Sequence, residues 1–154
     1  MTKLLTNTFL VALGTSVLLT TACKKDKPVT PAPVVVTNAM SYKLDGTVVT
    51  PTTVTGSYQN NAFGVTGAAT GKTLSISVPG VTAAGTFTNG SILYSEGTQA
   101  TTWYNAASSV VVTEFNATTK KASGTFTASL APFPGNAATT NKAVTAGTFT
   151  NVTF

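Results

Sequence analysis

The sequence contains few side chains that could perform acid–base or nucleophilic chemistry. It has no histidine, so a Ser-His-Asp triad, a Cys-His pair and a histidine-based zinc site cannot form within this chain. Of its four carboxylates, Asp26 precedes the expected domain and Asp45 falls in an expected turn. Glu96 and Glu114 are then the only pair that could flank a glycosidic bond. Because Glu96 also falls in a turn, we expect a protein without enzymatic activity.

Cofactor, metal and nucleic-acid sites also lack their usual residues. The glycines occur in turns and strands without the spacing of a dinucleotide or phosphate loop. A calcium loop needs clustered carboxylates, whereas those of this chain are dispersed. The net charge is +5, but the lysines of the expected domain are scattered and there is no arginine. We therefore expect no cofactor, no metal and no nucleic-acid partner.

Aromatic side chains provide the remaining candidates for ligand contact. Tyr94, Trp103 and Tyr104 lie near one another on two expected strands, and flat rings of this kind can stack on sugars. We nevertheless expect Trp103 to be the core tryptophan of a sandwich, with the tyrosine hydroxyls reaching its rim, and a ligand surface is the alternative. Adjacent residues of a regular strand point to opposite faces, so Trp103 and Tyr104 cannot point the same way. Phe133, in a loop bounded by prolines and a glycine, is a further candidate.

The amino-terminal residues predict export and lipid anchoring. A positively charged start is followed by an apolar stretch that is too short for a membrane-spanning helix but long enough for a signal peptide. The segment Leu19–Cys23 resembles the lipobox of bacterial lipoproteins, with Thr20 where that family prefers leucine. The resemblance implies that residues 1–22 are removed and that Cys23 is acylated, which would hold the protein on a membrane. An ordinary signal peptide cut before the same cysteine is the alternative.

Residues 23–39 are expected to form a flexible tether behind the acylated cysteine. Three prolines within six residues favour an extended spacer. The charges beside the anchor are similar to those of Bacteroidetes-type lipoproteins, in which acidic residues after the cysteine favour display on the cell surface. Asp26 is the only acidic residue there. We expect a lipid-anchored protein of the cell outer membrane, with periplasmic and surface-facing display both open.

Residues 40–154 are expected to form a single all-β domain. Only 8% of the chain is charged, and threonine, valine and glycine are abundant, as in a series of short strands and turns. Pairs such as Asp45-Gly46, Asn60-Asn61 and Asn89-Gly90 favour tight turns because they tolerate positive φ. No segment has a sustained helical period.

Alternation within the expected strands gives each one an apolar face and a hydroxyl-bearing face. In 73–78 and 122–130 every second residue is apolar or glycine, with serine or threonine between. The pattern predicts an antiparallel β-sandwich, with a flattened up-and-down barrel as the alternative. The expected strands are 41–44, 54–59, 62–66, 73–78, 85–88, 92–95, 101–104, 109–115, 122–130 and 143–154.

The tetrapeptide Gly-Thr-Phe-Thr occurs three times, at 85–88, 124–127 and 147–150. Its uneven spacing is not that of a solenoid repeat. We expect each copy to be a strand whose phenylalanine points inward and whose glycine allows a close approach. Aromatic rings lining a shared ligand surface are the alternative.

The last forty residues resemble a pattern found in small, uncharacterised Bacteroidetes-type lipoproteins. The segment Glu114–Phe126 contains an aromatic residue, a lysine-containing turn and a Ser-Gly-Thr-Phe strand, and Val144–Phe154 resembles the closing strand of that family. Asn116 stands where the family usually has aspartate. The resemblance implies a β fold and an envelope location, and brings no particular activity.

Two functions fit these features. The first is a non-enzymatic envelope lipoprotein with a binding or structural role, attached to the membrane through Cys23 and partnered by a glycan or an envelope protein. The second is a glycan-binding accessory module of a polysaccharide-uptake system. An exposed aromatic platform favours the second, whereas a smooth Ser/Thr surface with Trp103 buried favours the first.

Overall fold

A computed structural model describes residues 38–97, 101–135 and 139–154, which form β-strands and no helix. The all-β prediction is therefore confirmed for these ranges. The segments predicted as signal peptide and most of the tether fall on residues 1–37 and lie outside the described residues. The strands are β1 (Ala39–Leu44), β2 (Thr47–Val49), β3 (Thr53–Gln59), β4 (Ala62–Ala69), β5 (Lys72–Val78), β6 (Gly85–Phe87), β7 (Ser91–Glu96), β8 (Thr102–Asn116), β9 (Lys121–Pro132) and β10 (Lys142–Thr153).

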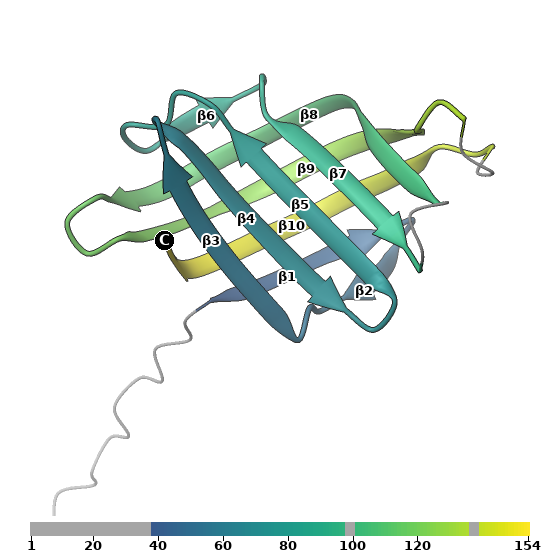
Figure 1. Cartoon of the computed structure of the whole chain (residues 1–154), viewed down its shortest axis with the longest axis horizontal. Coiled ribbons are helices and arrows are strands. Elements are labelled where there is room, and N and C mark those ends of the chain that lie inside the picture. Colours follow the sequence, from purple (N-terminus) through teal and green to yellow (C-terminus); the bar gives the residue numbers. More distant parts are fainter. Residues whose placement is uncertain (1–37, 98–100, 136–138) are drawn as a thin grey trace, which may run out of the picture. The chain divides into compact units, whose positions relative to one another are not determined.

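All ten strands belong to one antiparallel sheet in the order β2-β1-β10-β9-β8-β7-β5-β4-β3, with β6 paired to β8 beside β7. The sheet is strongly curled into a half-barrel, so that β3, β4, β5 and β7 cross over β8, β9 and β10 (Figure 1). The predicted sandwich of two sheets is not confirmed, because hydrogen bonding between β7 and β8 joins the two layers. The alternative, a barrel, is not closed either, since β2 and β3 end the strand order.

The tight turns follow the predicted chemistry with one exception. Asp45 and Gly46 both have positive φ between β1 and β2, and so do Asn60 and Asn61 between β3 and β4. Such turns match the twist of the strands that they join. The pair Asn89-Gly90 has no positive φ. Instead, the Gly90 carbonyl accepts hydrogen bonds from side chains of β8, which places this pair against the sheet.

Strand β8 is longer than the sequence suggests, because two expected strands are continuous. A bulge between Asn105 and Ala107 interrupts the pairing with β9 without ending the strand. The Asn105 side chain accepts a hydrogen bond from the Ile92 backbone at 2.8 Å and donates one to the Gly90 carbonyl at 3.1 Å. These hydrogen bonds replace the backbone pairing of β7 with β8 beyond Leu93, and β6 pairs with β8 further along, at residues 110–112.

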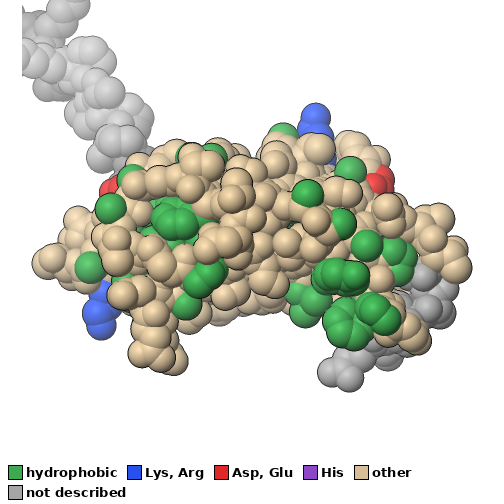
Figure 2. Space-filling view, turned by 90° about the horizontal axis from the view of Figure 1, so that it is seen from above, with side chains coloured by type: hydrophobic (Ala, Val, Ile, Leu, Met, Phe, Trp, Pro, Cys, Tyr) green, Lys and Arg blue, Asp and Glu red, His purple; other side chains and the backbone are tan. Residues whose placement is uncertain are grey.

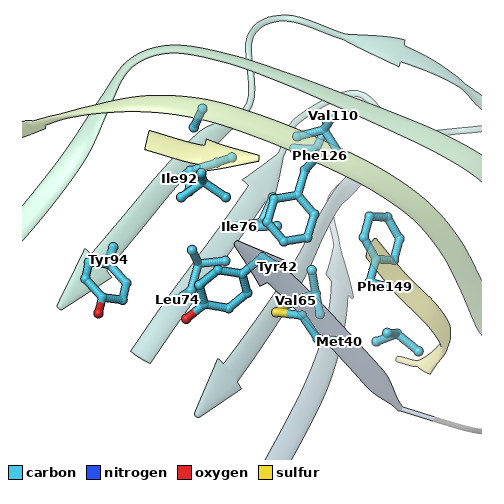
Figure 3. Packing of buried hydrophobic residues seen from close by; sticks show 14 of the residues in the cluster. Met40, Tyr42, Val65, Leu74, Ile76, Ile92, Tyr94, Val110, Phe126 and Phe149 are labelled. Atoms are coloured by element: carbon cyan, nitrogen blue, oxygen red, sulfur yellow. The ribbon is translucent and has the colours of Figure 1, made fainter. Parts of the chain in front are cut away.

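The concave side of the curled sheet contains the hydrophobic core (Figure 3). The predicted alternation is confirmed, since Leu74, Ile76 and Val78 are buried, as are alternate residues of β9. Rings from distant strands meet here, with Phe63 of β4 5.6 Å from Phe149 of β10 between ring centroids. Burial of large apolar side chains of this kind contributes about 2 kcal/mol each.

The repeated Gly-Thr-Phe-Thr segment has a reciprocal role in β9 and β10. Gly124 lies opposite Phe149, and Gly147 lies opposite Phe126. A Cβ at Gly124 would lie 2.5 Å from the Phe149 ring, and one at Gly147 would lie 2.6 Å from the Phe126 ring. Each phenylalanine therefore packs on the glycine of the other copy, which confirms the predicted inward rings and close approach for these two copies. Phe87, in the copy at 85–88, is only partly buried.

Candidate functional site

Two of the four aromatic candidates are inside the domain. Tyr94 of β7 and Trp103 of β8 are directly paired, with ring centroids 5.7 Å apart. Their exposed fractions are 0% and 4%. The Trp103 indole nitrogen donates a hydrogen bond to the Thr140 carbonyl at 2.9 Å. Both rings therefore belong to the core and offer no open face to a ligand.

The side chain of Lys142 covers this aromatic pair at one end of the core. Its ammonium lies 4.6 Å from the Trp103 ring centroid and 5.9 Å from that of Tyr94. The same ammonium is 3.4 Å from a Glu96 carboxylate oxygen and 3.8 Å from one of Asp45. Cation–π attraction and two ion pairs thus hold the lysine in place. We call Tyr94, Glu96, Trp103, Lys142 and Asp45 the end cluster.

The end cluster also changes the proton affinities of its members. The Tyr94 hydroxyl donates to Glu96 at 2.7 Å, and this hydrogen bond, with the nearby charge of Lys142, lowers the pKa of Glu96 against the opposing effect of burial. Burial, reinforced by the same bond, raises the pKa of Tyr94. The cluster therefore favours an ionised Glu96 beside a protonated Tyr94.

Tyr42 of β1 adds a buried hydroxyl to this end of the core. Its side chain is 1% exposed and its oxygen has no hydrogen-bond partner among the described residues. Figure 3 shows that oxygen turned toward the Tyr94 end of the labelled side chains. Burial raises the pKa of Tyr42 to about 12, with a smaller contribution from the charge of Glu96. An unsatisfied buried hydroxyl of this kind lowers stability.

The two glutamates considered as a catalytic pair are far apart. Glu96 ends β7 beside the start of β8, where Ser95 pairs with Thr102. Glu114 lies near the other end of β8, where it accepts a long hydrogen bond of 3.4 Å from Ser123. The stretch of strand from Thr102 to Glu114 covers about 40 Å. Glycosidase carboxylates are separated by less than about 10 Å, so this pair does not form. Among the described residues, no group of three or more metal-ligating side chains is present either.

The other two aromatic candidates are on the outer face of the sheet. Tyr104 is 39% exposed and Phe133 is 52% exposed, and their rings meet edge to face with centroids 5.8 Å apart. Leu93 of β7 lies directly opposite Tyr104 and is 43% exposed. Leu93, Tyr104 and Phe133 form what we call the outer apolar cluster. Trp103 and Tyr104 thus point to opposite faces, as the strand geometry requires.

A shallow groove of about 390 Å³ continues from the outer apolar cluster across β7, β5, β4 and β3. Leu93 belongs to both features. Figure 2 shows one face of the domain, on which uncharged surface predominates and hydrophobic side chains gather in a few places. A second groove of about 380 Å³ lies over β8, β9 and β10. The lining residues of the first groove are Thr55, Gly56, Ser57, Gly64, Thr66, Ser75, Ile76, Ser77, Ser91 and Leu93.

Leu93, Lys142 and the groove were not predicted from the sequence. The alternation in β5 and β7 places their hydroxyls on the face opposite the core, which was a usable signal. The neighbours of these strands are set by the strand order, which that alternation does not determine. Leu93 breaks a run of outward serines and could have been noted for that reason alone.

Comparison of the chain with protein-family models, curated proteins and solved structures gives no match. In the part of the chain that the structure describes, no helix has the length and apolar character needed to cross a membrane.

Proposed function

We propose that this protein is a non-enzymatic lipoprotein of the cell outer membrane that binds its ligand on the outer face of the sheet. The observation that carries the proposal is the continuity between the outer apolar cluster and the hydroxyl-lined groove. Contiguous exposed apolar patches and concave surfaces are features of interaction and ligand-binding sites. Cys23, diacylated before residues 1–22 are removed, attaches the domain to the membrane, and residues 23–39 hold it away from the bilayer.

A glycan-binding accessory module of a polysaccharide-uptake system is the second candidate. It is favoured by the exposure of Tyr104 and Phe133 beside many serine and threonine hydroxyls. The burial of Trp103 removes the largest ring from such a platform, which favours a broader binding role. The separation of Glu96 from Glu114 removes the one catalytic pair that the sequence offered.

The anchor is tested by fractionating cells that make the full chain or its Cys23→Ser variant. We expect the wild-type chain in the outer membrane, with a mass increased by acyl groups on Cys23. The variant should leave the membrane fraction and carry no acyl groups. Equal distribution of both chains would contradict the lipid anchor.

The binding role is tested by photo-crosslinking in the cells that make the protein. Leu93→p-benzoyl-phenylalanine places a photoreactive group at the junction of cluster and groove. Val48→p-benzoyl-phenylalanine is the matched control, because Val48 is also an exposed apolar side chain but lies on the edge strand β2. We expect adducts at position 93 and none at position 48. Equal labelling, or none at position 93, would contradict a binding role for this face.

A further inference from the structure

We propose, on the basis of the binding function above, that the outer face takes an uncharged glycan that lies across the strands with one sugar ring against Tyr104. The register of the sheet aligns one outward residue from each strand. Thr55 pairs with Thr66, which pairs with Ser75. Ser75 then pairs with Leu93, and Leu93 with Tyr104. At a strand spacing of ~4.8 Å, this row of five residues is about 19 Å long.

The described outward residues of β3, β4, β5 and β7, which surround this row, carry no charge. The outward residues of β3, β4, β5 and β7 are serine, threonine, glycine, alanine, glutamine and leucine only. The nearest charged side chains of these strands, Lys72 and Glu96, occupy strand ends, where they pair with each other in the register. A ligand with phosphate, sulfate or carboxylate groups would find no cation to pair with on this row. An uncharged ligand needs no such cation, so its binding is not weakened by the lack of charge on this row.

The groove offers hydroxyl groups at a density that suits a polyhydroxylated ligand. Thr66 and Ser75 share a hydrogen bond of 3.0 Å between their hydroxyl oxygens. The hydroxyls of Thr55, Ser77 and Ser91 engage no other group within the described residues. Each hydroxyl can both donate and accept, as can each hydroxyl of a sugar. These side chains can exchange hydrogen bonds with water for hydrogen bonds with a glycan.

Tyr104 supplies an apolar surface at the end of the row. Phe133 contacts its ring edge to face, which holds the ring in place while 39% of Tyr104 remains exposed. The opposite residue, Leu93, extends the apolar surface toward the groove. An aromatic ring presents both an apolar face and, in tyrosine, a polar edge, and this combination matches a sugar ring. Tyr104 is therefore the expected stacking residue, and Phe133 supports it.

Isothermal titration of the full acylated chain tests this ligand class, in a detergent without a sugar headgroup. The uncharged titrants are cellohexaose, maltohexaose, xylohexaose and mannohexaose, and hexagalacturonic acid is the charged counterpart. We expect at least one uncharged hexasaccharide to bind, and the acid to bind at least tenfold more weakly. Tyr104→Ala should weaken binding at least tenfold and Ser75→Ala two- to fivefold. Val48→Ala, with an unrelated exposed side chain, should leave the affinity unchanged.

The outcomes separate the ligand class from the binding function. If all uncharged hexasaccharides fail to bind at millimolar concentration, or if Tyr104→Ala binds as the wild type does, the glycan proposal is overturned. Protein adducts at position 93, or self-association that Tyr104→Ala abolishes, would then show that the same face binds a protein partner or a second copy. Failure of both the titration and the crosslinking would overturn the binding function as well. Thermal melts of the variants check that each one folds.

Discussion

The ammonium of Lys142 lies 4.6 Å from the centroid of the Trp103 ring and covers the only tryptophan of the chain. Trp103 therefore reports on the end cluster, whereas the exposed Tyr104 next to it belongs to the opposite face. The fluorescence of Trp103 should be blue-shifted, because this side chain is buried. An emission spectrum that no sugar changes would not argue against a ligand at Tyr104.

Replacement of Lys142 by methionine tests the contact between this lysine and the Trp103 ring. The Lys142→Met variant loses the cation–π contact and both ion pairs, and leaves Glu96 and Asp45 without their shared cation. We expect a loss of about 1–2 kcal/mol in the free energy of unfolding and a change in Trp103 emission. Urea melts followed by fluorescence measure both. Lys43→Met, at an exposed lysine of β1, is the control, and an identical response of the two variants would contradict the role given to Lys142.

Tyr42 and Tyr94 should respond in opposite directions to the loss of a hydroxyl. Tyr42→Phe removes a buried hydroxyl without a partner among the described residues, and should stabilise the domain by about 1 kcal/mol. Tyr94→Phe removes a hydrogen bond to a charged carboxylate, and should cost about 2 kcal/mol. Chemical denaturation of the two variants and the wild type measures these changes in the free energy of unfolding. A loss of stability in Tyr42→Phe would show that its hydroxyl has a partner.

Alkaline pH should destabilise the protein through the same two tyrosines. Tyrosine in an unfolded chain ionises near pH 10. In the folded protein, burial raises the pKa of Tyr42 to about 12, and it also raises the pKa of Tyr94. Above pH 10 the unfolded state thus binds fewer protons than the folded state, so the free energy of unfolding falls as pH rises. The stabilisation is complete below pH 10 and for Tyr42 is lost between about pH 10 and 12. The double variant Tyr42→Phe/Tyr94→Phe should show a shallower decline, and an equal slope would refute this linkage.

Local structure was more predictable than the arrangement of the strands. Alternation in β5 and β9 identified their buried faces correctly, because the period of a strand is a local property. The continuity of β8 was not predictable, since a bulge at Ala106 and the Asn105 side chain carry the strand through a polar stretch. The half-barrel was also missed, because curling depends on how ten strands twist and pair together.

Of the four aromatic candidates, two are buried and two are exposed. Strand geometry predicts only part of this division. The opposite directions of Trp103 and Tyr104 follow from the sequence, but which of the two faces the core does not. Phe133 was correctly placed in an exposed loop. Lys142 could not be linked to Trp103, because β7, β8 and β10 meet at the end cluster only through the fold.

The reciprocal glycines of β9 and β10 should tolerate no side chain. Gly124→Ala would drive a methyl group into the Phe149 ring and the Val111 carbonyl oxygen, and Gly147→Ala would drive one into the Phe126 ring, with loss of about 1–3 kcal/mol each. Gly85→Ala is the matched control from the copy at 85–88, where the nearest atom lies 3.5 Å from the added carbon. Its effect should be below about 1 kcal/mol. Thermal melts rank the three variants, and equal losses would rule out the reciprocal packing.

Ala146 in β10 should be one of the few positions at which glycine stabilises this protein. Its φ of 48° is in the left-handed region, at the bulge between Val144 and Gly147, where an L side chain costs about 1–2 kcal/mol. Glycine adopts this conformation freely but has more conformational entropy to lose on folding, so Ala146→Gly should gain about 0.5–1 kcal/mol and raise the Tm by several degrees. Ala143→Gly, in the same strand without positive φ, should lose a similar amount because only the entropy term remains. If both variants shift the Tm downward, Ala146 does not adopt the left-handed conformation in solution.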